Sequence, residues 1–220
     1  MHTIASTLYH AFLAVISPPF CTHCGTFLPC RAVLCDPCCK KIKPIVTKLV
    51  PVTGKYPVTL FAISSYEDPL KSLILAKSYR DHVASAQLGQ LVWELTDIRN
   101  VPFDCIVPIP LHWRRFAKRG YNQTAEIARI IAQKSGKPLI NALKRTTHRP
   151  FQAQVERDER DENVKGAFIL KPHKKELLAG KHVLIVDDLF TTGATMKTAT
   201  RELIRSKPSQ ITAVVACRTR

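Results

Sequence analysis

The stretch His182–Met196, HVLIVDDLFTTGATM, places an apolar run directly before two aspartates and a segment rich in threonine and glycine. The run VLIV is typical of a strand that is buried on both faces, and the residues after it favour a turn into a helix that begins near Ala194. In a parallel α/β sheet, ligands bind beyond the carboxyl ends of the strands. The stretch therefore predicts a ligand-binding loop at the end of a central strand.

The side chains of this loop suit two different parts of one ligand. Backbone N–H groups and the threonine hydroxyls of Thr191–Thr195 can hold a phosphate at the start of the helix, and Gly193 lets the backbone approach it closely. Carboxylates repel phosphate, so Asp187 and Asp188 suit the hydroxyls of a sugar or a divalent cation. A ribose 5-phosphate carries both a phosphate and sugar hydroxyls, so a site for it would use both sets of side chains. The alternative is a capped helix start beside two solvated acids.

Six of the eight cysteines fall within one short stretch, CTHCGTFLPCRAVLCDPCC. It contains two C-x2-C pairs, Cys21 with Cys24 and Cys35 with Cys38. Two such pairs can place four thiolates around a tetrahedral Zn²⁺, which leaves no open coordination position and indicates a structural site. Cys30 and Cys39 are each able to replace a neighbouring ligand. Disulfides are the alternative, but the absence of a secretory signal favours a reducing compartment.

Strands and helices alternate along most of the chain. Strands are predicted at Val58–Tyr66, Asp104–Pro108, His182–Val186 and Ile211–Cys217, and helices at Pro69–Tyr79, Val83–Leu95, Gln123–Ser135 and Ala194–Ser206. This alternation predicts a doubly wound, mostly parallel α/β sheet. A polar segment at about 144–180 interrupts it, and that length is typical of a functional flap. The predicted domains are 1–45, with the cysteine knuckle, and 55–220, joined by a Pro/Val/Lys-rich connector.

The first twenty residues, MHTIASTLYHAFLAVISPPF, carry apolar side chains at helical spacing. They lack the basic start and the small-residue cleavage site of a signal peptide. We interpret them as an amphipathic helix docked on the core, with the membrane surface as the alternative. No apolar run reaches the roughly 18–20 residues of a spanning helix. The expected location is therefore the cytoplasm, including the inner face of the membrane.

The chain is strongly basic, with 33 lysines and arginines against 17 acidic residues and a net charge of +16. Such a field attracts polyanions, so nucleic acid is the leading partner class and an anionic membrane face is the second. Five of the 17 acids lie in the run ERDERDE at Glu156–Glu162, which leaves the rest of the chain more basic still.

Val183–Thr195 resembles the 5-phosphoribosyl-1-pyrophosphate (PRPP) motif of type I phosphoribosyltransferases. Over nearly the whole chain, the order of motifs resembles the ComF family of competence proteins (ComFC/GntX-like): the cysteine pairs, PIPLHWRRFAKRGYNQ, Gln152 with Arg160-x-x-Asn163, and VDDLFTTGAT. One departure is LAKSYRD at Leu75–Asp81, where family members more often carry a Lys-aromatic-x-Gly run. The resemblance implies a type I phosphoribosyltransferase-like fold with a small N-terminal four-cysteine zinc knuckle.

The resemblance also implies roles for the residues of the loop after the central strand. Asp187 and Asp188 would orient the ribose hydroxyls and are the candidate catalytic residues. The 5-phosphate would be bound by Thr191, Thr192, Gly193, Ala194 and Thr195. In such a site PRPP binds together with Mg²⁺, so Mg²⁺ is the second expected cofactor after zinc.

A basic loop, HWRRFAKRG at His112–Gly120, follows the strand predicted at 104–108. It is expected either to grip the pyrophosphate of PRPP, as the resemblance implies, or to hold single-stranded nucleic acid by phosphate contacts and aromatic stacking. A solvated basic turn is the third interpretation. The residues assigned to this pyrophosphate or DNA site are Arg114, Arg115, Lys118, Arg119, Asn122 and, from the flap, Arg160. Asn122 is also predicted to cap the helix that follows.

Three functions fit these features. The preferred one is a protein of natural transformation and DNA uptake that binds single-stranded DNA in the cytoplasm and retains a PRPP-type site. The second is an active PRPP-dependent phosphoribosyltransferase, although no acceptor site is evident in the sequence. The third is a zinc-dependent docking partner of a DNA-translocating helicase, of the kind that a ComF operon encodes, at the inner membrane.

Overall fold

The computed structural model describes residues 20–29, 32–43, 45, 48–53, 56–76, 82–111, 116–117, 120–146 and 167–219. Several sequence predictions fall outside these ranges: the N-terminal helix, Cys30, the four cations of the basic loop, and flap residues 147–166 with Gln152, Arg160 and Asn163.

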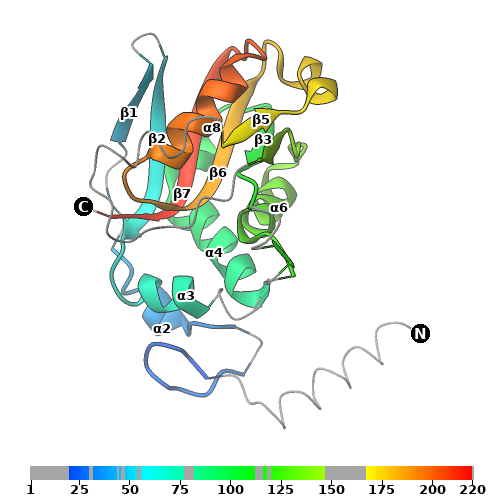
Figure 1. Ribbon diagram of the computed structural model, residues 1–220. Helices are drawn as coiled ribbons and strands as arrows, with labels where there is room; N and C mark the ends of the chain where they lie inside the picture. The colour runs from blue at the N-terminus through cyan, green and yellow to red at the C-terminus, as the bar shows by residue number, and fades with distance from the viewer. Residues whose placement is uncertain are drawn as a thin grey trace, which may run out of the picture.

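A five-stranded sheet in the order β1-β2-β7-β6-β3 forms the centre of the molecule (Figure 1). Its strands are β1 Lys48–Thr53, β2 Tyr56–Ser65, β3 Cys105–Pro108, β6 His182–Phe190 and β7 Gln210–Arg218. The strands β2, β7, β6 and β3 are mutually parallel, and β1 is an antiparallel edge strand. The sheet is therefore mostly parallel, as the alternation of strands and helices predicts.

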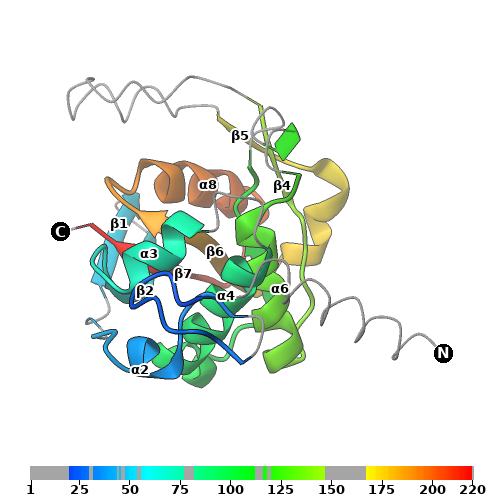
Figure 2. The ribbon, with the colours of Figure 1, turned by 90° about the horizontal axis from the view of Figure 1, so that it is seen from below.

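Helices cover both faces of this sheet, with α8 on one side and α4 and α6 on the other (Figure 2). The helices are α2 Asp36–Cys39, α3 Leu70–Ala76, α4 His82–Leu95, α6 Gln123–Ser135 and α8 Ala194–Ile204. Successive residues of β6 show the division, because Leu184 and Val186 pack with α4 and α6 while Val183 and Ile185 pack with α8. Both faces of β6 are buried, which explains its continuous apolar run.

The structure differs from the sequence prediction in the connector before β2. The segment predicted as a connector contains β1, which pairs with β2 from Lys48 opposite Leu60 to Thr53 opposite Tyr56. Its prolines argued against a strand, but a proline is tolerated in an edge strand, where one side of the backbone needs no partner. The strand β6 also runs on to Phe190, so both aspartates belong to the strand itself.

The flap begins and ends in regular structure. Its two ends form a short antiparallel hairpin of β4 Leu143–Arg145 and β5 Phe168–Leu170. Three-residue 3-10 helices follow, η3 Pro172–Lys174 and η4 Glu176–Leu178, and another, η2 Asp97–Asn100, precedes β3. The strand β5 contacts α8, and the residues just before β4 pair with β3, where Leu139 lies opposite Ile106.

The cysteine knuckle shares a hydrophobic core with the helices α3 and α4. Leu34, Cys38 and Ile42 belong to the same buried cluster as Leu73 of α3 and Leu88 of α4. The predicted division into domains at 1–45 and 55–220 stays a prediction. None of the helices in the described part of the chain is long and apolar enough to cross a membrane.

Candidate functional site

The carboxyl ends of the four parallel strands lie at one edge of the sheet, where ligands bind in folds of this type. The loop at residues 191–193 leaves β6 at this edge and leads into α8. The segment after β3 starts beside β6, because the N–H of Ile109 donates to the carbonyl of Val186 at 2.9 Å. The structure therefore places the residue that follows β3 next to the β6 residue that precedes Asp187, while residues 112–115 of the basic loop lie outside the described part of the chain.

The two aspartates occupy different environments at the end of β6. Asp187 is buried, with 8% of its surface exposed, whereas Asp188 is half-buried. The backbone N–H of Asp188 donates to Oδ1 of Asp187 at 2.9 Å, which fixes one carboxylate oxygen. Successive side chains of a strand point to opposite faces, so the two carboxylates leave β6 on different sides. Both residues stand at the carboxyl end of a central parallel strand, where ligands of such folds bind, and their role toward sugar hydroxyls stays a prediction.

Position 193 requires glycine for two reasons, its backbone conformation and the close approach of a neighbouring ring. It stands at the N-cap position of α8 with φ of 81°, in the left-handed region that favours glycine. A Cβ atom there would lie 2.6 Å from Cζ of Phe190, closer than side chains tolerate. The loop therefore closes over the Phe190 ring and presents the N-terminus of an 11-residue helix at the ligand edge.

The threonines of this loop are placed unequally. Thr191 is exposed, Thr192 and Thr195 are half-buried, and Thr192 Oγ1 accepts a long hydrogen bond of 3.4 Å from the N–H of Ala194. The N-cap residue of α8 is Gly193, which has no side chain, so this contact to the first N–H of the helix comes from the Thr192 hydroxyl. The capping role and the phosphate role of these hydroxyls both stay predictions.

Asn122 occupies the predicted N-cap position of α6, but its side chain makes no cap hydrogen bond. Its Nδ2 instead donates to the carbonyl of Ile109 at 3.4 Å, and the hydroxyl of Thr124 donates to the same carbonyl. These contacts tie the start of α6 to the end of β3. The other residues assigned to this site, Arg114, Arg115, Lys118, Arg119 and Arg160, lie outside the described residues.

Near this edge the sequence interpretation passed over Tyr66 and left Gln123, which helix capping does not explain, without an assigned role. Tyr66 directly follows β2, and burial, followed by the charges of Cys217, Asp68 and Asp188, raises the pKa of its phenol. Gln123 is 1% exposed, and its Nε2 has no hydrogen-bond partner among the described residues. Tyr66 could have been found from its position after a parallel strand. Nothing in the sequence predicted that the side chain of Gln123 is buried, because glutamine in the first turn of a helix is usually solvated.

The four predicted zinc ligands converge. The sulfur atoms of Cys21, Cys24, Cys35 and Cys38 all lie within 4.8 Å of one another, and the Cys24 and Cys35 sulfurs are 3.7 Å apart. A tetrahedral ion with Zn–S bonds of about 2.3 Å requires sulfur separations of about 3.8 Å, so the cluster fits zinc. A disulfide would need about 2.05 Å. Cys39, the alternative ligand, lies half-buried and accepts instead a 3.7 Å contact from the side chain of Gln87.

The surroundings of the thiols differ across the cluster. The hydroxyl and N–H of Thr26 lower the pKa of Cys24 to about 6, while burial and the neighbouring thiols raise the pKa of Cys38 well above its usual range. The N–H of Cys35 points to the sulfur of Cys21 at 3.5 Å, a contact typical of backbone support for a metal-bound thiolate. Four thiols and no open position are the donor set of a structural zinc ion.

Comparison with known proteins agrees with this architecture. A family model described as the phosphoribosyl transferase domain matches residues 118–220. Competence protein F of Haemophilus influenzae is 30% identical over 186 residues, which cover 81% of this chain and 75% of that protein. The DNA utilization protein YhgH of Escherichia coli K12 is 31% identical over 171 residues, covering 73% and 72%. Competence protein ComFC of Bacillus subtilis is 31% identical over 99 residues, covering 45% and 38%.

The matches to competence protein F and YhgH extend over most of the chain, and the central sheet is mostly parallel. The chain therefore belongs to the ComF family of competence and DNA utilization proteins, with a phosphoribosyltransferase-type domain and an N-terminal four-cysteine cluster.

Proposed function

We propose that the protein binds single-stranded DNA during its uptake or use, and that the β6 loop keeps a PRPP-type ribose-phosphate site. The observation that carries the proposal is the similarity, over about three quarters of the chain, to proteins named for competence and DNA utilization. The proposed location is the cytoplasm, where incoming strands are handled, with the inner face of the membrane as a secondary place of contact.

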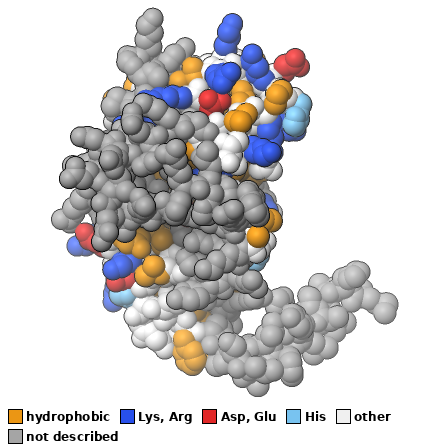
Figure 3. All heavy atoms as spheres, viewed as in Figure 1, with side chains coloured by type: hydrophobic (Ala, Val, Ile, Leu, Met, Phe, Trp, Pro, Cys, Tyr) orange, Lys and Arg blue, Asp and Glu red, His pale blue; other side chains and the backbone are white. Residues whose placement is uncertain are grey.

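The charge of the chain supports the DNA-binding part of the proposal. The net charge is +16, and phosphate neutralisation by lysine and arginine supplies most of the affinity of non-specific nucleic-acid binding. Lysine and arginine side chains gather at the upper right of Figure 3, over the segment that holds η3 and η4. Lys175 and Lys181 in this segment are exposed, and η3 itself carries His173 and Lys174.

The geometry at the end of β6 supports the ribose-phosphate part. Asp187 and Asp188 offer acceptors for ribose hydroxyls, and the α8 N-terminus behind Gly193 offers N–H donors to a phosphate. The carboxylates fit Mg²⁺ as well, since hard cations prefer oxygen ligands, and a bound Mg²⁺ would offset the charge of pyrophosphate. In the proposed function this site senses a ribose-phosphate ligand.

Phosphoribosyl transfer is a second candidate function, favoured by the buried, hydrogen-bonded Asp187 at the ligand edge. In that case the same residues would position PRPP, and charge stabilisation would assist the loss of pyrophosphate. Release of pyrophosphate in the presence of an acceptor base would establish turnover. Binding of PRPP without turnover across bases would leave a sensor.

Docking to a DNA-translocating helicase is a third candidate, favoured by an aromatic pair on the knuckle. Phe20 and Phe27 are 52% and 56% exposed, with ring centroids 5.9 Å apart in an edge-to-face arrangement. Exposed aromatic rings are enriched in protein interfaces. Loss of helicase capture on substitution of both phenylalanines, with DNA binding intact, would favour this function.

The experiment that tests the proposed function is a titration of zinc-loaded protein against a fluorescently labelled single-stranded oligonucleotide. We expect saturable binding at about 50 mM salt that weakens steeply as salt is raised, because counterions are released from the DNA. Absence of binding at that salt concentration would contradict the proposal. A duplex of the same sequence serves as the comparison for strand preference.

A further inference from the structure

A groove of about 600 Å³ runs beside α6, between this helix and the end of the basic loop. Phe116 and Tyr121 line it from the loop side, and Ala125, Ala132 and Leu139 provide a mostly apolar floor and far wall. Glu126 and Arg129 line it from the exposed face of α6. The groove is separate from the β6 loop, since no residue of 187–195 contributes to it.

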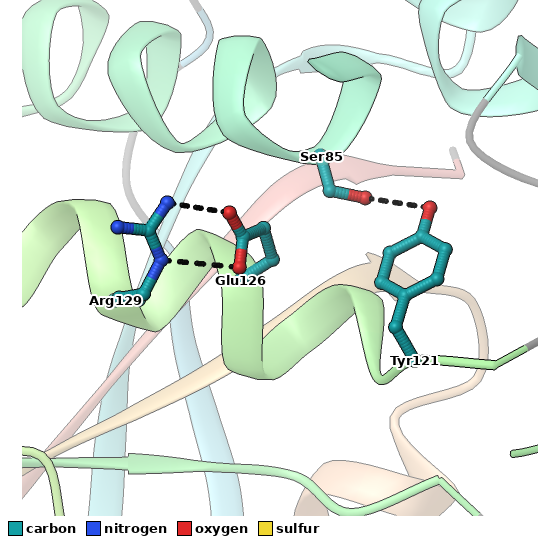
Figure 4. Close-up of polar contacts among 4 residues, drawn as sticks. All are labelled: Ser85, Tyr121, Glu126 and Arg129. Carbon is teal, nitrogen blue, oxygen red and sulfur yellow. Dashed lines mark hydrogen bonds and ion pairs between the residues drawn. The ribbon is translucent and has the colours of Figure 1, made fainter. Parts of the chain in front are cut away.

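The aromatic residues of the groove differ in how firmly they are held. Tyr121 is 6% exposed, its ring is stacked on His82 with centroids 3.9 Å apart, and its hydroxyl is 3.2 Å from Oγ of Ser85 (Figure 4). Phe116 is 49% exposed, which leaves much of its ring uncovered. The groove thus combines a fixed wall with an available stacking surface, and a fixed wall lowers the entropy cost of binding.

The polar side of the groove is electrically balanced. Arg129 donates two hydrogen bonds to Glu126, from Nε at 3.1 Å and from Nη2 at 2.6 Å, and this contact raises the pKa of the guanidinium (Figure 4). Nη1 takes no part in the pair. An ion pair of this kind does not favour a phosphate, because the carboxylate repels it. It does offer donors and acceptors side by side, as the edge of a nucleobase requires.

Two exposed lysines stand close in sequence to groove residues near the C-terminal end of α6. Lys134 follows the groove residue Gln133, Lys137 precedes the groove residue Leu139, and both lysines are exposed. An apolar slot with an uncovered aromatic ring, close in sequence to two exposed lysines and in a chain of net charge +16, is complementary to a base with its adjoining phosphates. A hydrophobic peptide segment would fill the slot but would make no use of these charges.

From these contacts we infer that the groove is a nucleobase subsite, in which one base of a single strand stacks on Phe116 and its edge faces the Glu126–Arg129 pair. Lys134 and Lys137 contact the neighbouring phosphates. The inference deepens the proposed function and rests on it, since it assigns single-stranded DNA to a particular surface. It does not involve the ribose-phosphate site of the β6 loop.

The test is an anisotropy titration of the full, zinc-loaded chain with labelled oligothymidylate, for wild type and variants. Phe116→Ala should weaken binding roughly tenfold or more, and Phe116→Tyr should restore most of the affinity, because stacking needs only a ring. Leu49→Ala is the matched control, since Leu49 is 65% exposed, lies on edge strand β1 and is outside the groove. Lys134→Ala should reduce the salt slope by about one, whereas Phe116→Ala should leave it unchanged.

Photocrosslinking provides a readout of position. An oligonucleotide that carries 5-iodouracil should crosslink to the peptide with Phe116 or Tyr121. If wild type binds DNA while Phe116→Ala binds equally well, or if crosslinks map only to other peptides, the subsite is wrong and the proposed function still stands. If wild type binds no single-stranded DNA at about 50 mM salt, the proposed function itself fails, and the subsite with it.

Discussion

The side-chain amide of Gln87 forms hydrogen bonds with both the backbone N–H and the backbone carbonyl of Leu34. Its Oε1 accepts from the N–H of Leu34 at 3.0 Å, and its Nε2 donates to the carbonyl of Leu34 at 2.9 Å. The same Oε1 also accepts from the N–H of Val33 at 2.9 Å. Leu34 directly precedes Cys35, so one residue of α4 fixes the backbone that leads into the second cysteine pair.

This contact predicts a measurable role for Gln87 in stability. Gln87→Ala removes the partner of the N–H of Val33 and of the N–H and carbonyl of Leu34, two buried residues, and we expect it to lower the free energy of unfolding by about 1–3 kcal/mol. It should also speed zinc loss to a chelator, because the second cysteine pair loses its support. Urea denaturation and a chelator competition assay measure the two effects. Gln90→Ala, an exposed position on the same helix, should change neither.

The four-cysteine cluster predicts a specific metal dependence. Cys35→Ser should lose the bound zinc, about one ion per chain, and lower the melting temperature, because a structural zinc ion contributes directly to folding. Zinc content by elemental analysis and melting by circular dichroism measure this. Cys39→Ser should keep its zinc, since Cys39 contacts Gln87 and lies outside the cluster of four. Zinc loss from Cys39→Ser, with retention in Cys35→Ser, would mean that the ligand set is wrong.

Burial of His182 predicts a pH dependence of stability. His182 is 6% exposed and its Nε2 is 2.9 Å from Oγ1 of Thr212. Burial lowers the pKa of this imidazole, with smaller opposing contributions from the Pro102 carbonyl and Asp104. Below its unfolded pKa of about 6.5, the unfolded chain therefore binds more protons than the native one, and stability falls as pH falls.

The measurement is the free energy of unfolding of wild type and His182→Gln between about pH 7 and pH 5. Glutamine keeps a partner for Thr212 but cannot titrate, so we expect a shallower decline with acid in the variant. Acid release of zinc affects both proteins alike and cancels in the comparison. Parallel declines would show that His182 does not contribute to the pH dependence.

The sequence predicted the central strands and helices well where the hydrophobic period was clear. The helix α6 begins and ends where predicted, at Gln123 and Ser135, because its apolar spacing and its terminal glycine at 136 are both strong signals. Edge strand β1 was missed, because prolines obscure a strand that pairs on one side only. The extension of β6 to Phe190 was missed since polar residues rarely continue a buried strand.

The candidate site was predictable only where the chemistry is local in sequence. Spacing alone brought Cys21, Cys24, Cys35 and Cys38 into one predicted cluster, which the structure forms. Contacts between residues that are distant in the sequence left no pattern from which they could be predicted. The position of Gln87 beneath the knuckle and the charge of Asp188 acting on Tyr66 depend on packing between distant segments. The site assignments at the β6 loop remain predictions that ligand binding has to test.

The central claim is that the β6 loop binds a ribose-phosphate ligand in a protein that also binds DNA. The most direct test is a calorimetric titration of PRPP with Mg²⁺ into zinc-loaded wild type, alone and with single-stranded DNA present. Asp188→Ala is the variant, and Asp97→Ala, an exposed acid on η2, is the control. We predict saturable PRPP binding by wild type and by Asp97→Ala, and none by Asp188→Ala. Absence of PRPP binding by wild type, or equal binding by Asp188→Ala, would contradict the account.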